Sequence, residues 1–509
     1  MSRHLEISID RQSRIPIAQQ TRDAIRRMIE EDMLQPETRL PSSRRLGMDL
    51  GVSRSVVVEA YEQLIAEGYL VARRGSGTSV APSVRPPRES VLAAPQRPVA
   101  ARWDLRTGGC DASWFPRQEW VRCLTAVISA AGPSELGYAT PAGPPAVRQA
   151  AAGYLSRVRG VRARADRVMM TAGFAQGLAL LCAVLRERGH EVVAVEDPGH
   201  PGERQFMSRA GLRPVGVPVD ADGLVVDELY RTGARAVVVT PACQFPTGVP
   251  LAAHRKAELV EWAHRVDGFV IEDDFESAFV AAADRAPALQ SLAPDRVVYA
   301  GSASKVLAPA LRLGWLVVPS PLMPGLEFVR SSRDFGCSGL EQLAFARFLE
   351  TGGFDRHLRR VRDEVRKRRE QVRDDALRLL PGVRPIGAAS GLQTYLELPA
   401  GCDEAALLRA AQARSVLVHG AQFYRINRAV QPGAVVVSYA TVHRPGLSRA
   451  MAALGIAYRE VCTGPPVRHH RGGKSMRTGL GAHAVDPARE LRVPVTASPP
   501  LGPRVVRPG

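Results

Sequence analysis

The residue best suited to covalent chemistry in this sequence is a lysine, Lys305. Only four of the 68 basic residues are lysines, so a lysine within a patterned segment suggests a chemical role. Lys305 ends the run Gly301-Ser-Ala-Ser-Lys, which directly follows an apolar segment. A lysine amine shielded from water is a nucleophile that forms a Schiff base with an aldehyde. Nearby, the hydroxyl of Ser302 and the planar guanidinium of Arg312 are suited to binding a phosphate. The alternative is an ordinary surface lysine, which leaves this flanking pattern unexplained.

Acidic residues follow a second apolar segment. Glu272, Asp273 and Asp274 end the stretch that begins at Phe269. Pyridoxal phosphate, an aldehyde cofactor, needs an acid beside its ring nitrogen. A helix cap would explain one aspartate but not the run. The turn at 171–177 precedes a helical segment, whose first backbone N–H groups are suited to holding the cofactor's phosphate.

These residues follow strand-like segments, which indicate the fold class. Short runs rich in β-branched residues alternate with amphipathic helical segments such as 254–265. Nearly continuous apolar runs are typical of strands that are buried on both faces. The pattern predicts an α/β domain with a mainly parallel sheet covered by helices on both sides. The strands are predicted at 192–195, 236–240, 269–271, 297–300 and 313–318.

The first eighty residues have a different pattern, in which short helices precede a hairpin. Ser42 or Ser43 can cap a short helix. Gly51 can end that helix, and Ser53 can cap the next one. Two short strands joined by a tight turn follow at 69–80. Two helices joined by a turn and followed by a hairpin predict a winged helix-turn-helix domain.

Such a domain presents the start of its second motif helix to base edges in the major groove. That places Arg54 and Ser55 at the groove, with Ser53 at the helix start as a phosphate donor. Arg44 is expected to hold the DNA backbone, and Gly77 lets the hairpin tip approach the minor groove closely. The alternative is a small helical bundle whose arginines face solvent. The combined spacing favours DNA binding.

Charge and composition divide the rest of the chain. Residues 1–80 hold 12 basic and 11 acidic side chains, although the whole chain carries a net charge of +17. Net charge is therefore weak evidence for DNA binding. Residues 81–102 contain five prolines and no apolar periodicity, which predicts a linker before the large domain at 103–461. Residues 462–509 predict a disordered basic tail, with an arm that binds DNA as the alternative.

The cysteines and the N-terminus bear on the compartment. The seven cysteines form no CxxC pair, which argues against a disulfide scaffold and a structural zinc site. Residues 1–12 carry charges throughout, unlike a signal peptide. No apolar run reaches the ~18 residues that span a bilayer. We expect a soluble, cytoplasmic protein that binds neither a metal nor a membrane.

Four motifs of the first eighty residues occur together. They are Leu40-Pro-Ser-Ser-Arg, Gly51-Val-Ser-Arg, Ala60-Tyr-Glu-Gln-Leu-Ile-Ala-Glu-Gly-Tyr-Leu70 and Gly75-Ser-Gly-Thr78. The segment resembles the GntR-type DNA-binding domain, and more closely its MocR subfamily. The resemblance implies double-stranded DNA as the partner, with contacts from Arg44, Ser53, Arg54, Ser55 and Gly77. Val56 stands where threonine is usual and Glu59 where arginine is usual, so no operator sequence carries over.

The large domain carries its own ordered set of motifs. They are Gly143, Tyr154-Leu155, Arg159-Gly160-Val161, Glu196-Asp197-Pro198-Gly199, Thr240-Pro241, Phe245-Pro246-Thr247-Gly248 and the Asp273 and Lys305 segments. They resemble fold-type I pyridoxal-phosphate enzymes, which share the aspartate aminotransferase fold, again in the MocR version. The resemblance implies that Lys305 is the Schiff-base lysine and Asp273 the pyridinium partner. The phosphate contacts that it implies are Ser302, Arg312, Gly173, Phe174 and Ala175, with Tyr138 reaching the neighbouring subunit's phosphate in a head-to-tail homodimer.

Several positions depart from the family pattern. Phe275 replaces a tyrosine whose hydroxyl would bond the cofactor's phenolic oxygen, and His200 replaces a tyrosine that stacks on the ring. Phe245 stands where aminotransferases place an asparagine, and Cys243 where MocR proteins commonly have histidine. The segment 434–440 aligns with one that holds a carboxylate-binding arginine in several relatives, yet it contains none. The nearby candidates for that role are Arg425, Arg428 and Arg444.

Three functions fit these observations. The favoured one is a transcription regulator whose aminotransferase-like domain binds pyridoxal phosphate and senses it or an amine or amino-acid effector. The second is an active aminotransferase with an appended DNA-binding domain, which the missing asparagine and arginine disfavour. The third is a cofactor-free scaffold for dimerisation.

Overall fold

The computed structural model describes residues 5, 7–13, 15–31, 33–73, 77–82, 101–280, 285–387, 391–427 and 432–462. The chain divides into two compact units, Met1–Ala100 and Ala101–Gly509. Most of the predicted linker, and all of the predicted tail except its first residue, lie outside the described residues.

Among its described residues, the N-terminal unit contains three helices and a hairpin. Its helices are α1 (Ile17–Glu30), α2 (Ser43–Leu50) and α3 (Arg54–Ala66), and the antiparallel strands are β1 (Leu70–Arg73) and β2 (Gly77–Val80). Ser42, rather than Ser43, caps α2, since its side chain accepts a hydrogen bond from the backbone N–H of Arg45. Gly51 ends that helix at a φ of 62°, a left-handed conformation that glycine adopts without strain. The winged helix-turn-helix order predicted from the sequence is therefore present.

The unit is held together by one apolar core between the helices and the hairpin. Leu46, Val57 and Leu64 are fully buried there, together with Leu70 from β1 and Val80 from β2. The Tyr61 hydroxyl reaches into the loop before α2 and donates to the carbonyl of Pro41 at 2.9 Å. This packing fixes the start of α3 relative to α2.

The large unit contains an eight-stranded sheet in the order β4-β11-β10-β9-β8-β5-β6-β7. Five neighbouring strands, β10, β9, β8, β5 and β6, run parallel, whereas β4 and β6 pair antiparallel with β11 and β7, and β11 is antiparallel to β10. The mainly parallel sheet predicted from the sequence is confirmed. The strands are β4 (Val168–Thr171), β5 (Val192–Asp197), β6 (Arg213–Asp220), β7 (Gly223–Leu224), β8 (Ala236–Val239), β9 (Phe269–Asp273), β10 (Val297–Ser302) and β11 (Gly314–Val317).

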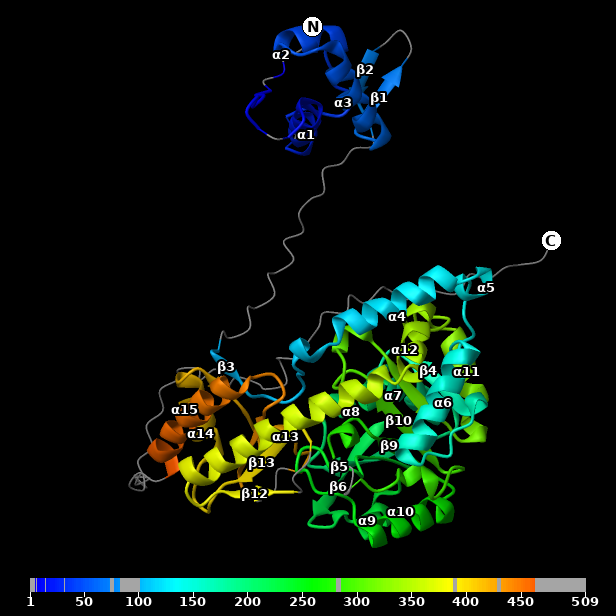
Figure 1. Cartoon of the computed structure of the whole chain (residues 1–509), viewed down its shortest axis with the longest axis vertical. Coiled ribbons are helices and arrows are strands. Elements are labelled where there is room, and N and C mark those ends of the chain that lie inside the picture. Colours follow the sequence, from blue (N-terminus) through cyan, green and yellow to red (C-terminus); the bar gives the residue numbers. More distant parts are fainter. Residues whose placement is uncertain are drawn as a thin grey trace, which may run out of the picture. The chain divides into compact units, whose positions relative to one another are not determined.

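Helices cover both faces of this sheet, as alternate residues of its strands show. Phe269 and Ile271 of β9 pack with α7 and α11 on one face, whereas Val270 packs with α9 and α10 on the other. Figure 1 shows this layered arrangement around the central strands. The helices are α4 (Arg117–Ala130), α5 (Pro133–Leu136), α6 (Pro145–Arg159), α7 (Phe174–Glu187), α8 (Pro201–Arg209), α9 (Val226–Thr232), α10 (Ala253–Arg265), α11 (Met323–Ser331) and α12 (Gly339–Glu350).

A smaller antiparallel sheet follows, in the order β12-β13-β16-β15. Its strands are β12 (Arg384–Ile386), β13 (Gln393–Glu397), β16 (Ala434–Ser438) and β15 (His419–Gly420), and β14 (Val416–Leu417) pairs separately with β3 (Trp103–Asp104). Leu396 packs into the core with α13 (Gly353–Leu379) and α15 (Arg444–Cys462), beside α14 (Glu404–Ala413). Tyr395 and Val436, which pair across the strands, lie on the opposite face with Phe245. That face is therefore turned toward the loop that follows β8.

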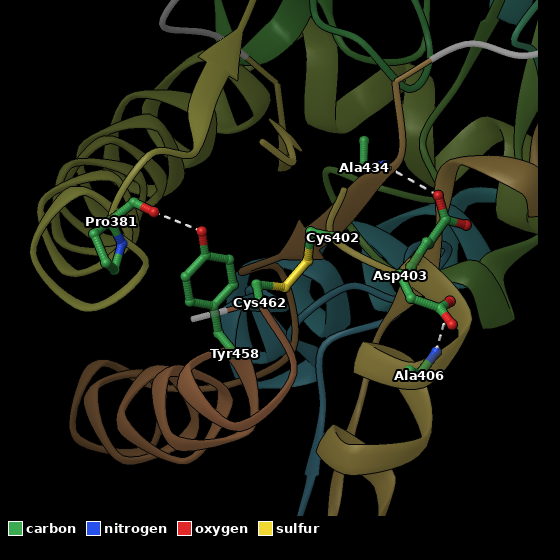
Figure 2. Close-up of a disulfide and its surroundings, with 8 residues drawn as sticks. Pro381, Cys402, Asp403, Ala406, Ala434, Tyr458 and Cys462 are labelled. Atoms are coloured by element: carbon green, nitrogen blue, oxygen red, sulfur yellow. Dashed lines mark hydrogen bonds between the residues drawn. A yellow bond between two sulfur atoms is a disulfide. The ribbon is translucent and has the colours of Figure 1, made fainter. Parts of the chain in front are cut away.

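A disulfide joins Cys402 to Cys462, and the sequence did not predict it. The two residues are 60 positions apart along the chain, yet their Cα atoms lie 4.7 Å apart where the end of α15 meets the start of α14 (Figure 2). The sequence analysis argued only against a disulfide scaffold and did not identify this single pair, because spacing along the sequence does not give the distance between cysteines on packed helices. No described helix is both long and apolar enough to cross a membrane.

Candidate functional site

Lys305 lies just beyond the end of β10, in a loop ordered by serine hydroxyls. The Ser302 side chain accepts a hydrogen bond from the backbone N–H of Ser304 at 3.2 Å, and the two hydroxyl groups lie 3.0 Å apart. The Lys305 ammonium donates to the carbonyl of Gly108, from the segment that follows β3. Burial lowers the pKa of Lys305, while Glu276, Cys110 and Asp273 oppose that shift. The lysine amine is therefore partly shielded from water, as nucleophilic chemistry requires.

The acidic run has three different environments, because successive residues of β9 point to opposite faces. Glu272 accepts backbone hydrogen bonds from Leu289 and Gln290, both at 2.9 Å, and serves the fold. Asp274 is held by a buried guanidinium, that of Arg159, whose Nε lies 2.7 Å from Oδ2. The Tyr299 hydroxyl also donates to Asp274, at 2.6 Å.

Asp273, between them, points the other way. It is 5% exposed, and its Oδ1 has no hydrogen-bond partner among the described residues. Burial and repulsion by Glu203 and Asp274 raise its pKa well above the usual value. A buried acceptor without a donor is costly, so this atom is suited to an N–H group that a ligand brings.

The segments predicted to hold a phosphate lie together at the start of α7. Gly173 precedes the helix at a φ of 86°, and the N–H groups of Phe174 and Ala175 begin its first turn. Arg312 is exposed and donates to the carbonyl of Ala172, which brings its guanidinium against Gly173. Helix N-termini and guanidinium groups both favour anions. The structure thus places the predicted phosphate-binding groups of α7 beside Arg312.

His200 caps α8 rather than projecting as a free base. Its Nδ1 accepts a hydrogen bond from the Gly202 N–H at 3.1 Å, and its ring lies 5.3 Å from that of Phe245. Surrounding protein atoms, and then the charges of Lys305 and Arg204, lower the pKa of His200 to about 4. A neutral, fixed imidazole offers a flat surface on which an aromatic ring can stack.

These groups fit pyridoxal phosphate. The orphaned Oδ1 of Asp273 suits a pyridinium N–H, the α7 start and Arg312 suit a phosphate, and Lys305 suits an aldehyde. The start of β11 also packs closely against the turn before α7, because a Cβ on Gly314 would lie 2.7 Å from the backbone of Gly173. The donor set therefore matches each end of the cofactor.

The sequence analysis missed one acid at this site, Glu276. It is 3% exposed and accepts hydrogen bonds from the Gln393 amide at 3.0 Å and the Cys243 thiol at 3.5 Å. Burial raises the pKa of Glu276 to about 7, and the charge of Lys305 partly offsets that rise. Phe275, the predicted cofactor neighbour, packs its ring 5.9 Å from Phe245 instead of offering a polar group.

Of the two candidate arginines that the structure describes, Arg425 is buried near the site. Arg425 is 6% exposed, and its Nη2 donates to the Tyr395 hydroxyl at 3.2 Å and to the carbonyl of Pro432 at 2.8 Å. Arg444 begins α15 and donates to Gln371 on α13, which places it outside the site. Arg428 lies outside the described residues.

Tyr138 does not join the site of its own chain. Its side chain is 98% exposed and lies beside Phe335, which is also exposed, at 6.4 Å between ring centroids. Its predicted role at a neighbouring subunit's phosphate requires a dimer, which a single chain does not test.

The predicted DNA contacts all lie on the surface of the N-terminal unit. Arg44 and Arg54 are exposed, and Nε of Arg54 donates to the Ser43 hydroxyl at 3.4 Å. Ser53 stands at the N-cap of α3, but its hydroxyl pairs with Ser55 at 2.8 Å instead of capping the backbone. The predicted N-cap position of Ser53 is therefore confirmed, although its hydroxyl bonds Ser55 rather than a backbone N–H.

The start of β2 brings a further basic residue to the hairpin. Gly77 adopts a φ of 85°, and a Cβ there would lie 3.2 Å from Nε of Arg39. No pattern in the sequence pointed to Arg39, which reaches the hairpin because it bridges to Ser79. Residues 74–76 at the tip lie outside the described residues.

Comparison with known protein families agrees with the division of the chain into an N-terminal unit and a large unit. The gntR family of bacterial regulatory proteins matches residues 17–80, and the class I and II aminotransferase family matches residues 115–454. The fold and site thus define a helix-turn-helix protein joined to a fold-type I aminotransferase domain.

Individual relatives narrow the assignment. The probable rhizopine catabolism regulatory protein MocR of Rhizobium meliloti is 32% identical over 429 residues, which covers 80% of this chain and 87% of the relative. The pyridoxine biosynthesis transcriptional regulator PdxR of Corynebacterium glutamicum is 34% identical over 397 residues, covering 77% and 85%. The chain belongs to the MocR family of GntR-type transcriptional regulators, and its N-terminal domain is a DNA-binding domain.

A solved structure supports the fold of the large unit. The α-aminoadipate aminotransferase LysN of Thermus thermophilus, complexed with N-(5'-phosphopyridoxyl)-L-leucine, matches with a TM-score of 0.63 and 26% identity. The match covers 70% of this chain and 92% of that one. The large unit therefore has the fold of a pyridoxal-phosphate aminotransferase.

Proposed function

We propose that this regulator binds pyridoxal phosphate at Lys305 and that the cofactor, alone or with an amine or amino-acid effector, controls its binding to promoter DNA in the cytoplasm. The observation that carries the proposal is the buried Oδ1 of Asp273, which has no partner among the described residues and whose charge influences the pKa of the shielded Lys305 amine. When bound, the cofactor supplies an aldehyde that reacts with amines.

The chain's own residues have separate tasks in this proposal. Asp273 holds a proton at the cofactor's ring nitrogen, and His200 covers one face of the ring. The α7 start, Ser302 and Arg312 hold the phosphate. Lys305 supplies the amine. A ligand changes DNA binding only if it favours one arrangement of the protein over another. In this proposal an effector does so when its amine takes the place of the Lys305 amine at the cofactor.

Footprinting of DNA upstream of the gene tests this proposal. Wild type and Lys305→Ala are compared with and without pyridoxal phosphate, and Lys367→Ala, an exposed lysine on α13, is the matched control. We expect a footprint whose extent or affinity changes with cofactor in the wild type and the control but not in Lys305→Ala. No protection of upstream DNA under any condition would overturn the proposal.

The DNA contact has its own test. Removal of the Arg54 side chain should weaken operator binding by about 10- to 100-fold, as expected for loss of a base contact. Arg378→Ala, at an exposed position on α13, is the control and should leave affinity unchanged. Equal affinity of Arg54→Ala and wild type would remove Arg54 from the interface.

We further propose a head-to-tail homodimer, which the pair of exposed rings at Tyr138 and Phe335 supports. A dimer would also explain binding to paired half-sites. Sedimentation of wild type and Tyr138→Ala tests it. A monomer in the wild type at micromolar concentration would contradict the dimer.

The enzyme alternative has one observation in its favour, since the cofactor side of the site carries the expected lysine and aspartate. It predicts repeated turnover with some amino donor and keto acid. Failure to find turnover across a broad panel of both would remove it.

A further inference from the structure

A small cavity lies beside the ends of β9 and β10. Its volume is about 40 Å³, and Asp274 and Ser302 are among the residues that line it. A space of this size accommodates a water molecule or one small ion. Lys305, Asp273 and Arg312 are not among the described residues that line it. The cavity is therefore a separate space from the one proposed for the cofactor.

The described lining of this cavity contains three arginines but one carboxylate. Arg159 ends α6, Arg362 belongs to α13, and Arg285 precedes the short turn at 289–291. The carboxylate is that of Asp274. Arg159 already occupies both of its oxygens, with Nε 2.7 Å from Oδ2 and Nη2 3.3 Å from Oδ1. The charge of Asp274 is therefore balanced by Arg159, which leaves the charges of Arg285 and Arg362.

Arg285 and Arg362 donate to backbone carbonyl groups rather than to carboxylates. Their acceptors lie in the segment 278–280. Within the part of the chain that the structure describes, neither arginine has an ion-pair partner within 4.0 Å. Asp355 acts on Arg362 from farther away, and it is already paired with Arg157 at 2.7 Å. Two guanidinium groups of the lining thus lack a counterion among the described residues.

Two buried donors of the lining also lack acceptors. Nε of Arg285 and Nε1 of Trp315 have no hydrogen-bond partner among the described residues. Burial and the charges of Arg362 and Arg159 lower the pKa of Arg285 to about 10, so this arginine stays charged at neutral pH. A buried donor without an acceptor costs free energy. The lining therefore presents positive charge and N–H groups, which suit a negatively charged acceptor.

We propose that this cavity binds one small monovalent anion, either a halide such as chloride or a short carboxylate such as formate. Arg285 and Arg362 supply the charge, and Nε1 of Trp315 supplies a further N–H group. A water molecule would accept from these donors but would leave both guanidinium charges unbalanced. The anion would also reduce repulsion among the three arginines beside the Arg159–Asp274 pair. The inference is independent of the proposed function, because the site needs no cofactor.

The test uses the full-length protein without cofactor. Sodium chloride or sodium formate replaces sodium gluconate, whose anion is too large for the cavity, at constant ionic strength so that general screening stays the same. The midpoint of thermal unfolding measures stabilisation, since a ligand that binds only the folded chain raises it. Sodium bromide provides a second readout, because bromide quenches the fluorescence of a nearby tryptophan such as Trp315.

Two cavity variants, Arg285→Gln and Arg362→Gln, each remove one charge, and Arg373→Gln, at an exposed position on α13, is the matched control. Wild type and control should show a saturable rise in midpoint with chloride, formate or both. Each cavity variant should bind the anion about 10- to 100-fold more weakly, as expected for loss of a hydrogen bond to a charged group. In gluconate alone, Arg285→Gln should unfold at no lower temperature than wild type, because it removes a buried charge that has no counterion among the described residues.

The absence of any saturable effect of chloride, formate and bromide in the wild type would overturn the inference and leave the cavity to water. Equal anion affinity of the wild type and both cavity variants would overturn it as well, because the anion would then bind elsewhere. A response to chloride alone, or to formate alone, would support the site and identify the ion. If Arg285→Gln did not fold, Arg362→Gln would give the same comparison.

Discussion

The two sides of the Lys305 site differ in what they carry. The cofactor side has an acid, Asp273, whose Oδ1 lacks a partner among the described residues, together with a helix start for phosphate and a shielded lysine. The facing side has Phe245, the segment 434–440, which contains no arginine, and the buried acid Glu276. The proposed function therefore relies on the cofactor side, whose groups fit pyridoxal phosphate, whereas the facing side offers no arginine in the segment 434–440.

Breaking the support of the cofactor side should have the largest effect. Asp274→Ala leaves Arg159 as a buried charge without its ion-pair partner and should lower the free energy of unfolding by about 3–5 kcal/mol. Chemical denaturation without cofactor measures it. Asp355→Ala, which removes the half-exposed partner of Arg157, should cost less than about 1 kcal/mol. Equal losses would show that Asp274 supports the site no more than a surface pair does.

On the facing side, the buried acid Glu276 should make the free energy of unfolding depend on pH. The pKa of Glu276 is raised from 4.5 to about 7 in the folded protein. From about pH 4.5 to 7 the unfolded chain has released this proton while the folded chain keeps it, so stability falls as pH rises. Glu276→Gln removes this loss. Its unfolding free energy relative to wild type should rise by about 3 kcal/mol across that window and stay constant above it.

Denaturation curves of both proteins at about pH 4.5, 6, 7 and 8 check this, because these pH values span the pKa of Glu276 in the unfolded and in the folded chain. Other titrating groups cancel in the difference. A constant difference at all four pH values would mean that the Glu276 carboxyl titrates alike in the folded and unfolded chains.

Substitution of Asp273 should weaken cofactor binding without lowering stability, whereas substitution of Asp274 should lower stability. Asp273→Asn removes the charge that a pyridinium N–H needs and should weaken cofactor binding by about 10- to 100-fold. Without cofactor the variant should be no less stable than wild type, because it replaces a buried ionisable carboxyl, whose pKa burial raises, by a neutral amide of the same shape. Titration with pyridoxal phosphate and denaturation of the cofactor-free protein separate the two effects. A loss of stability without loss of affinity would contradict the assignment.

Part of the cofactor side was predictable because it follows strand periodicity. The acidic run after Phe269 indicated an acid at a strand end, and Asp273 was chosen from it by resemblance to the family. The structure explains why one acid differs from its neighbours. Glu272 bonds the backbone at Leu289 and Asp274 pairs with Arg159, whereas Asp273 lies on the opposite face of the strand, where its Oδ1 has no partner among the described residues. Five strands of the large sheet (β5, β8, β9, β10 and β11) and the helix α10 were predicted for the same reason, with their ends shifted by one or two residues, whereas β4, β6 and β7 were not predicted.

Glu276 escaped prediction because it lies beyond β9, in a turn where alternation no longer applies. Its partner Gln393 is 117 residues away, so no local pattern connects them. The Cys402–Cys462 disulfide was missed for a similar reason, since it depends on how α14 and α15 pack. Contacts between distant elements are set by tertiary packing, which a single sequence read by periodicity does not specify.

The smallest expected effect would sharpen the comparison at Phe275, which lies between the two sides. Its ring packs against Phe245, and the residue lines a cavity together with Ser302 and Tyr299. If the position adjoins the cofactor's phenolic oxygen, Phe275→Tyr adds one hydrogen bond and should tighten cofactor binding by about 2- to 10-fold. Titration of the variant with pyridoxal phosphate, beside Phe335→Tyr as an exposed control, measures the change. Unchanged affinity would contradict the placement of Phe275 beside the cofactor's phenolic oxygen.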